Sequence, residues 1–264
     1  MKDKLMQTVY ILWQKQMKKM MVHPESIVGM LLQPAMWVIL FGAGMRSLMG
    51  STSAGNGQDY ITFMVPGITA LTVVSAAIAG GSTWLIERTS GIVKEYLAAP
   101  ISRLGILSGQ AAGVVSKVLL QSIIILLVGV LMGAGLNRQP AGLAGGLLLI
   151  AAYGIGFSGL ALAVASSTDS SEGYHMMIFL VQLPLLFLSN SLYPLAALPG
   201  WMKVGVYANP TTYVVSGLRQ ITMAAAPSMG AADAVPIWLC FLVSGLFAVV
   251  GMLLARRAFL KSIR

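Results

Sequence analysis

Charge is scarce in this chain. Only 9% of its 264 residues are charged, whereas 57% are hydrophobic. Too few polar side chains are present to cover a water-soluble globule of this size, so the composition excludes that class. It is typical instead of a bundle of membrane helices.

Cysteine, histidine and the common catalytic motifs are nearly absent. The single Cys240 cannot form a disulfide within the chain, and its apolar neighbours favour a buried, inert thiol. Two histidines, with no HExxH, GxSxG or paired Cys/His spacing, offer no metal centre or hydrolytic triad. GxxxxGKS and GxxxxGKT are also missing, so the chain has no phosphate-binding loop of this type. We expect no enzyme activity and no cofactor in this chain.

Close pairs of acids are equally rare. Asp169 and Glu172 are the one such pair in a loop between apolar stretches. Helix capping is the favoured interpretation, because Ser167, Thr168, Asp169 and Ser170 are all good N-cap residues and acids suit a helix N-terminus. Carboxylates are missing from the centres of the apolar stretches, which argues against a proton- or sodium-coupled carrier.

The sequence does contain a series of long apolar stretches. A hydrocarbon core about 30 Å thick needs about 20 apolar residues per helix. Six stretches reach that length: residues 27–48, 60–86, 104–136, 141–167, 173–198 and 234–255. Their hydrophobic residues do not alternate, so we predict an all-α, polytopic integral membrane protein with six transmembrane helices in one domain, and not an outer-membrane barrel.

The basic residues sort to one side of these spans. The N-terminal tail has five, the C-terminal tail has four, and the loop after the second span has Arg88, Lys94 and Arg103. Because lysine and arginine accumulate in cytoplasmic segments, we expect both termini and this loop in the cytoplasm, and the protein in the inner (cytoplasmic) membrane. Lipid headgroups explain the net charge of +9, so we expect no nucleic-acid partner.

An amphipathic helix is predicted within residues 1–26. Its apolar side chains recur at helical spacing, while lysines and glutamines occupy the other faces. The apolar set is Leu5, Val9, Leu12, Trp13, Met17 and Met20. We expect this helix to lie among the lipid headgroups before the first span, with packing on a partner protein as the alternative.

Two features inside the spans are candidates for a transport pathway. Pro66-Gly67 interrupts the second span, which is compatible with a packing kink or with a gate. Lys117 is the one charge well inside a span, so it is either a functional intramembrane charge or a side chain that reaches the inner headgroups. Recurrent glycines in the second, third and fourth spans predict close helix packing or dimer contacts.

The stretch 189–236 is apolar, rich in proline and aromatic residues, and on the outer side of the predicted topology. A soluble loop would be more polar, and aromatic side chains of this kind favour the membrane interface. We predict short helices that dip back into the outer leaflet as a re-entrant hairpin.

Three segments resemble the permease subunits of type-2 ATP-binding-cassette (ABC) exporters. They are DYITFMVPGITAL at 59–71, ERTSGIVKEYLAAPISRLGILSGQ at 87–110 and YPLAALPGWMKVGVYANPTTYVVSGLRQ at 193–220. Their order and six-span spacing extend the resemblance over most of residues 1–264. The daunorubicin-resistance-like drug-export permeases look most similar.

This resemblance implies that residues 88–100 form a coupling helix that docks on a separate ATPase subunit. The local spacing agrees, because Ile92, Tyr96 and Ala99 fall on one helical face, and Pro100 marks a helix boundary. The implied coupling residues are Glu87, Arg88, Ile92, Lys94, Glu95, Tyr96 and Pro100. The gating and pathway candidates are Pro66, Gly67, Lys117, Pro194, Asn209, Pro210 and Tyr213, the last four within the outer hairpin at 193–220.

The resemblance also implies the partners and the task. Two copies of an ATPase subunit would bind ATP and magnesium, and a second permease chain would complete a homodimer or heterodimer. The implied cargo is a hydrophobic or amphiphilic drug, with a lipid or a lipid-linked polysaccharide as the alternative. A channel or scaffold that does not use ATP is the competing class, and ATP-dependent flux would separate the two.

Overall fold

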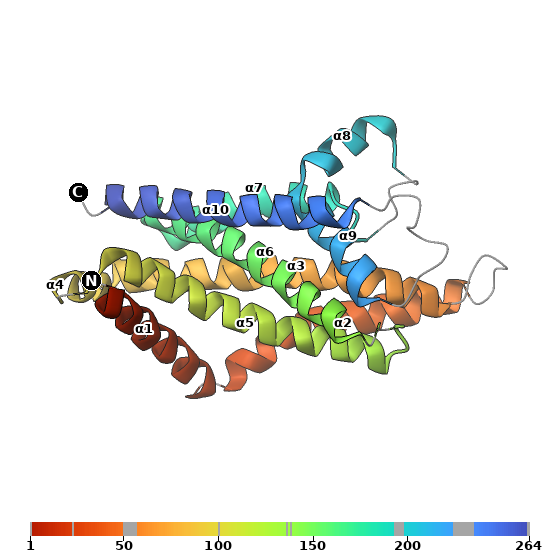
Figure 1. The fold of residues 1–264 in the computed structure, drawn as a ribbon, viewed down its shortest axis with the longest axis horizontal. Helices are drawn as coiled ribbons and strands as arrows, with labels where there is room; N and C mark the ends of the chain where they lie inside the picture. Colours follow the sequence, from red (N-terminus) through yellow and green to blue (C-terminus); the bar gives the residue numbers. More distant parts are fainter. Residues whose placement is uncertain are drawn as a thin grey trace.

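The computed structural model describes residues 2–22, 24–49, 57–99, 101–135, 137, 139–192, 198–223 and 235–262. These ranges fold into α-helices that run mostly along the long axis of the molecule, with both chain ends at one end (Figure 1). The helices are α1 Lys2–Val22, α2 Pro24–Met49, α3 Gly57–Thr89, α4 Ile92–Ala98, α5 Arg103–Leu131, α6 Pro140–Ser167, α7 Ser171–Phe187, α8 Gly200–Ala208, α9 Pro210–Thr222 and α10 Ile237–Ser262. The predicted all-α class is confirmed for the described residues.

Four of these helices, α3, α5, α6 and α10, are long and apolar enough to cross a membrane. They coincide with four of the six predicted spans, which makes the chain a polytopic membrane protein. Among the side chains that the structure describes in α2, Leu31–Leu40 form a shorter apolar stretch, and α7 has 17 residues, so crossing by these two helices stays a prediction. The predicted fifth span ran to residue 198, but α7 ends at Phe187, shortly after Pro184 removes a backbone donor.

The centre of the bundle is α3, which packs against α2, α5, α6, α7 and α9 (Figure 1). Two of its buried hydroxyl groups are satisfied within the helix. The Oγ1 atoms of Thr69 and Thr72 donate to the carbonyls of Val65 and Ile68, each at 2.8 Å. These two threonines therefore enter the apolar core without leaving an unpaired donor.

The helix pair with the largest interface is α6 with α10, and glycines allow their two backbones to approach closely. A Cβ atom added to Gly251 would lie 2.2 Å from the carbonyl oxygen of Gly156, and one added to Gly159 would lie 2.3 Å from the backbone of Gly251. The two backbones are thus in direct contact, as small residues allow. The predicted close packing is confirmed here between helices of one chain.

The N-terminal helix α1 packs along the first turns of α5. Its predicted apolar face does point inward, but Thr8 and Gln16 are also buried at the centre of that face. Three glycines of α5, spaced four residues apart, receive three residues of α1 with the same spacing. The facing pairs are Gly105 with Thr8, Gly109 with Leu12, and Gly113 with Gln16. The inward face of α1 is therefore held by its own chain.

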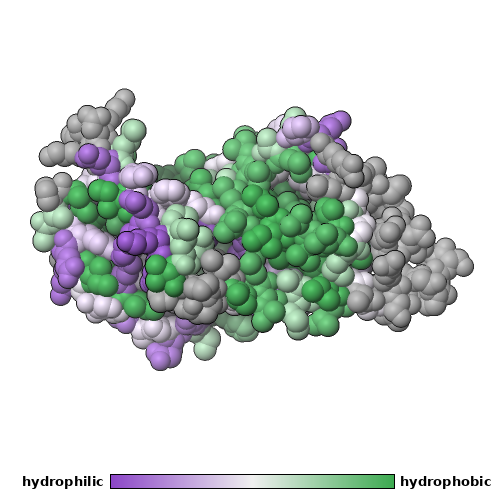
Figure 2. All heavy atoms as spheres, turned by 90° about the horizontal axis from the view of Figure 1, so that it is seen from below, coloured by the Kyte–Doolittle hydropathy of each residue, from purple (hydrophilic) through white to green (hydrophobic). Residues whose placement is uncertain are grey.

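Hydropathy divides the surface along the long axis. Figure 2 views the molecule from below Figure 1, the side on which α1 lies. Hydrophobic residues form a band over the middle, and hydrophilic residues gather toward the end that carries α1 and α4. This pattern is expected of a chain that crosses a bilayer and projects one end into water.

Candidate functional site

The predicted coupling segment is divided by a turn. Arg88 lies in the last turn of α3, and Gly91 adopts a left-handed conformation with φ 84° that separates α3 from α4. The helix that follows spans only Ile92–Ala98, because Ala99 is extended. It is shorter than the predicted helix at 88–100, and Pro100 lies outside the described residues.

The inward face of α4 also differs from the predicted one. Val93 is buried, and Tyr96 and Leu97 pack beside it against the hydrophobic cluster at this end of the bundle. Ile92 is half-buried, whereas Ala99 is exposed. The prediction that Ile92, Tyr96 and Ala99 share one helical face was therefore wrong for Ala99, because the helix ends one residue earlier.

The opposite side of α4 is open. Lys94 and Glu95 are both exposed, next to each other on a helix that sits at the hydrophilic end of the molecule (Figure 2). Their charges are available to a partner, while Val93 fixes the helix to the bundle.

A chain of polar side chains connects α4 to three other helices. Lys15 of α1 forms an ion pair with Glu87 of α3, with 2.8 Å between Nζ and Oε1. Lys15 also donates to the hydroxyl of Tyr96 on α4 and lies over its ring, 5.0 Å from the centroid. Glu87 is 4% exposed, so its carboxylate depends on these partners.

The same chain continues into α5. Gln110 donates from Nε2 to the second oxygen of Glu87 at 2.8 Å, and accepts from Gln16. Gln16 in turn accepts from Nζ of Lys117 at 3.0 Å. Lys117, predicted as either a pathway charge or an interfacial one, thus has a partner on α1, midway along α5.

The charge of Lys15 is stabilised by this arrangement. Partial burial lowers its pKa, but the hydrogen bonds to Glu87 and Tyr96 and their charges outweigh that effect. The pKa of Lys15 is therefore raised above its ordinary value of 10.5, and the side chain is cationic at physiological pH.

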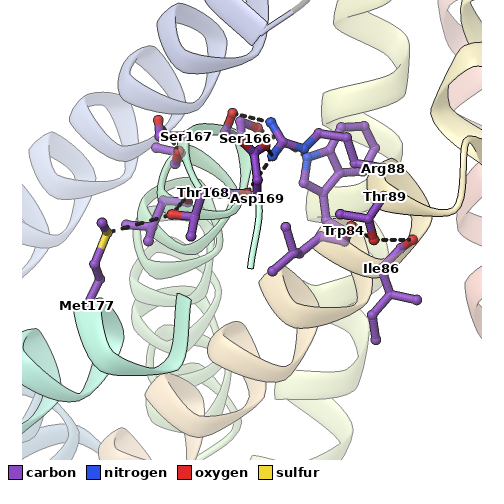
Figure 3. Close-up of polar contacts among 12 residues, drawn as sticks. Trp84, Ile86, Arg88, Thr89, Ser166, Ser167, Thr168, Asp169 and Met177 are labelled. Carbon is purple, nitrogen blue, oxygen red and sulfur yellow. Dashed lines mark hydrogen bonds and ion pairs between the residues drawn. The ribbon is translucent and has the colours of Figure 1, made fainter. Parts of the chain in front are cut away.

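Arg88 ties the end of α3 to the loop between α6 and α7 (Figure 3). Its Nη1 donates to the Ser166 carbonyl at 2.5 Å, and its Nη2 donates to the Thr168 carbonyl and to Asp169 Oδ1, the latter at 2.6 Å. Trp84, one turn earlier, donates from Nε1 to the Ser166 hydroxyl at 3.1 Å. Arg88 therefore supplies the donors that carbonyls at the end of α6 lack.

Replacing Arg88 by methionine is expected to cost about 2–3 kcal/mol, because buried carbonyls lose a charged donor. Asp169 is the matched control, since its side chain is 98% exposed and an exposed ion pair contributes little. Thermal unfolding of Arg88→Met and Asp169→Asn in detergent would compare them. Equal destabilisation would show that the ion pair matters and the carbonyl contacts do not.

The predicted cap of α7 is present. The Ser170 hydroxyl accepts from the Gly173 amide at 3.0 Å, and Glu172 lies in the first turn. Asp169 does not cap the helix, because it pairs with Arg88.

At the other end of the molecule, Pro66-Gly67 faces the segment that follows α7. A Cβ added to Gly67 would lie 2.1 Å from the Ser191 carbonyl oxygen, so glycine is needed for this backbone contact. Arg219 of α9 holds the same segment, donating to the Asn190 carbonyl at 2.6 Å and to the Phe63 carbonyl of α3 at 2.9 Å. Its guanidinium also stacks on the Phe63 ring at 3.6 Å.

Asn209 organises the hairpin of α8 and α9. Its side-chain oxygen caps α9 by accepting from the Thr211 amide at 2.9 Å, and its Nδ2 donates to the Leu185 and Leu188 carbonyls at the end of α7. Pro210 occupies the first turn of α9, where a missing amide proton costs nothing. The hairpin turn is therefore fixed to α7.

Tyr213 joins the two arms of the hairpin, since its hydroxyl donates to the Tyr207 carbonyl of α8 at 2.8 Å. Gly67 and Asn209, each next to a predicted proline, thus both contact the stretch 185–191 at the end of α7, whereas Lys117 connects through Gln16 and Gln110 to the coupling residue Glu87. Pro194 lies outside the described residues.

Sequence reasoning missed two polar residues that join helices. Gln16 and Gln110 looked like ordinary positions on α1 and α5, although glutamine in an apolar helix is itself a signal. Arg219 is near the end of the segment 193–220 that resembles the exporter permeases. Nothing in the sequence predicted its contact with Phe63, which is 156 residues earlier in the chain.

The comparisons with known proteins agree with this architecture. The model of the family "ABC-2 type transporter" matches residues 7–223. The chain belongs to the ABC-2 type transporter family. It is therefore a transport permease, as the resemblance of residues 59–71, 87–110 and 193–220 implied.

Three relatives show the breadth of this ABC-2 family. The daunorubicin resistance ABC transporter permease protein DrrB1 of Streptomyces coeruleorubidus is 25% identical over 75% of this chain and 69% of its own. Nodulation protein J of Rhizobium meliloti (strain 1021) is 26% identical over 81% and 78%. The inner membrane transport permease YadH of Escherichia coli (strain K12) is 24% identical over 79% and 80%. The resemblance seen in the sequence is confirmed.

Proposed function

We propose that this ABC-2 permease is the membrane-spanning subunit of an ATP-driven exporter. It moves a hydrophobic or amphiphilic, drug-like substrate out across the cytoplasmic membrane, and a separate ATPase subunit supplies the energy. The observation that carries the proposal is the structure of α4. This short helix has an exposed charged face, and hydrogen bonds connect its other side to α1 and, through Lys15 and Glu87, to α3 and α5.

The contacts of α4 suit force transmission. An ATPase that docks on Lys94 and Glu95 would move a helix anchored by Val93 and by the bond from Lys15 to Tyr96. Lys15 passes that motion to Glu87 at the end of α3, which is the central helix. Two ATPase copies and a second permease chain complete the machine, with both termini in the cytoplasm as the basic residues favour.

A groove between α2, α3 and α7 is the best candidate for a cargo surface. Its lining is mostly apolar and includes Trp37. The described lining has Gln33, Thr72, Ser75 and Gln182 as polar residues and no charged side chain. Such a surface suits an uncharged or amphiphilic molecule. The groove has a volume of about 100 Å³, below the ~300 Å³ of a drug-sized site, so α2 or α7 would have to move to admit cargo.

Charge reversal on α4 tests the coupling. Glu95→Lys is expected to weaken ATPase docking about tenfold or more, the effect of ~1.4 kcal/mol at a charged interface, while the chain still inserts and folds. The measurements are copurification of the ATPase in mild detergent and its substrate-stimulated activity. Glu172→Lys is the control, because Glu172 is an equally exposed acid on α7.

Full coupling in Glu95→Lys and in a Lys94→Glu variant would refute docking on α4. A clean preparation of the wild-type chain with no P-loop ATPase would instead favour the channel or scaffold class.

Export of a lipid or a lipid-linked polysaccharide is the second candidate. The exposed apolar residues of α7, such as Phe179 and Leu180, would admit acyl chains as readily as a drug. Unchanged sensitivity to a broad drug panel on deletion, with altered outer-leaflet lipid or surface glycan, would favour this alternative.

A further inference from the structure

Three lysines gather where α1 crosses α5. Lys18 and Lys19 are exposed on α1, and Lys117 is half-buried on α5. Gln16, which accepts a hydrogen bond from Lys117, is three residues before Lys19 on α1, so the two lysines lie at the same crossing and their like charges repel each other. Within the described ranges the ion pairs are Lys15 with Glu87 and Arg88 with Asp169, so none of these three lysines has a carboxylate partner there.

Glu87 cannot neutralise the group. Its charge reaches Lys117, but its two carboxylate oxygens are taken by Lys15 and Gln110. Lys117 has instead the neutral oxygen of Gln16 as its partner. The cluster therefore keeps an excess of positive charge, and an anion placed between Lys19 and Lys117 would relieve their repulsion.

The surface beside the cluster is amphipathic. A shallow groove on α1 is lined by Ile11, Gln14, Lys15, Lys18, Lys19 and Val22. Ile11 and Val22 are 60% and 62% exposed, so apolar and cationic side chains share the groove. This combination matches a molecule with a negative headgroup and an apolar stem better than it matches a free anion.

The cluster also lies at the right depth for a lipid headgroup. Since α5 has 29 residues and about 20 suffice to cross the hydrocarbon, about nine residues at one end project beyond it. If these are the first nine, where α1 packs, Lys117 is six residues, or about 9 Å, inside the edge at 1.5 Å per residue, within reach of the headgroups. Figure 2 shows hydrophilic residues at this end, directly beside the hydrophobic band.

We propose that Lys19 and Lys117, assisted by Lys18, bind the phosphate of an anionic phospholipid in the leaflet that contacts α1. Lys117 then connects the bound lipid through Gln16 and Gln110 to Glu87, which holds Lys15 and thereby Tyr96 of α4. The lipid would thus favour a docking-ready α4. Lipid binding is independent of the proposed export function, whereas this consequence rests on it.

The test uses the full-length chain in uncharged detergent, without the ATPase. Dioctanoyl phosphatidylglycerol and dioctanoyl phosphatidylcholine are titrated, and bound lipid is followed by native mass spectrometry together with thermal unfolding. We expect wild type to retain and be stabilised by phosphatidylglycerol. Lys19→Gln and Lys117→Gln should each weaken this binding about fivefold, and the double variant more than tenfold.

Two further variants keep the result interpretable. Lys117→Arg retains the charge and should retain binding, which separates a lost phosphate contact from a lost fold. Lys261→Gln removes an exposed lysine from the last turn of α10, at the same end of the molecule, and should bind as wild type does.

Four results would overturn the proposal. The first is equal binding of the two lipids, and the second is an equal loss of lipid binding in Lys261→Gln. The third is the same stabilisation by inorganic phosphate. The fourth is unchanged lipid binding in Lys19→Gln and Lys117→Gln variants that no longer copurify with the ATPase. The third would indicate a free-anion site and the fourth an acidic protein surface. Phosphatidylglycerol binding by a chain that never copurifies with an ATPase would support this site while counting against the proposed function.

Discussion

Lys15→Met is expected to damage the protein more than Glu87→Gln, although the two residues form one ion pair. The reason is their unequal burial, since the Lys15 side chain is 41% exposed and that of Glu87 is 6% exposed. Removing the lysine leaves a buried carboxylate with Gln110 as its remaining partner, whereas removing the acid leaves an ammonium group that water can reach.

The expected sizes follow from the same difference. Lys15→Met should lower the free energy of unfolding by about 2–3 kcal/mol, and Glu87→Gln by about 1 kcal/mol, because the amide still accepts a hydrogen bond. The double variant should regain about 1 kcal/mol over Lys15→Met, since no charge is then left buried. Chemical unfolding in detergent measures all three, with Lys261→Met as the exposed-lysine control.

The pH dependence adds a check on this pair. A raised pKa means that the contribution of Lys15 is complete below its ordinary value of 10.5 and is lost as the pH rises through the raised value. The difference between wild type and Lys15→Met should therefore stay constant from about pH 6 to pH 8. If Glu87→Gln lowered the free energy of unfolding more than Lys15→Met does, the carboxylate, and not its lysine partner, would organise the cluster.

The sequence predicted the helices better than their contacts. Long apolar runs and turn residues are local signals, so α3, α5, α6 and α10 fall close to the predicted spans. Ends were less accurate, because Gly91 and Pro184 act within single turns that hydropathy does not resolve.

The packing of α1 on α5 could be predicted only in part from the sequence. Gly105, Gly109 and Gly113 repeat every four residues, which places them on one helical face and marks it for a close neighbour. The sequence did not identify α1 as that neighbour. The face of α1 that packs there has the polar residues Thr8 and Gln16 at its centre, so its sequence did not indicate a buried face. Only tertiary contact shows that these polar groups have partners.

Gly67→Ala is expected to disturb the end of the bundle opposite α1 and α4 more than any other single methyl group added there. The new Cβ would lie 2.1 Å from the Ser191 carbonyl oxygen, a backbone atom that cannot rotate away. Relief requires a shift of the 189–191 segment or of α3. The expected cost is about 3 kcal/mol, the upper end of measured overpacking effects.

This shift should have a specific consequence. Arg219 reaches the Asn190 carbonyl on that segment and the Phe63 carbonyl on α3, so separating the two would break at least one of these bonds. Amides of residues 185–192 should exchange hydrogen faster in Gly67→Ala. Gly245→Ala is the matched control, because nothing lies within 4 Å of its added Cβ, and alanine there should leave stability unchanged or raise it by about 0.5–1 kcal/mol.

The same pair of variants separates packing from gating at Pro66-Gly67. If Gly67 only allows close packing, Gly67→Ala should lose stability and transport together, and lowering the temperature should restore both. If the contact with Ser191 must open during transport, the variant should stay impaired when fully folded, because the added methyl group alters the closed state itself. Equal exchange rates and stability in Gly67→Ala and Gly245→Ala would refute the contact on which both interpretations depend.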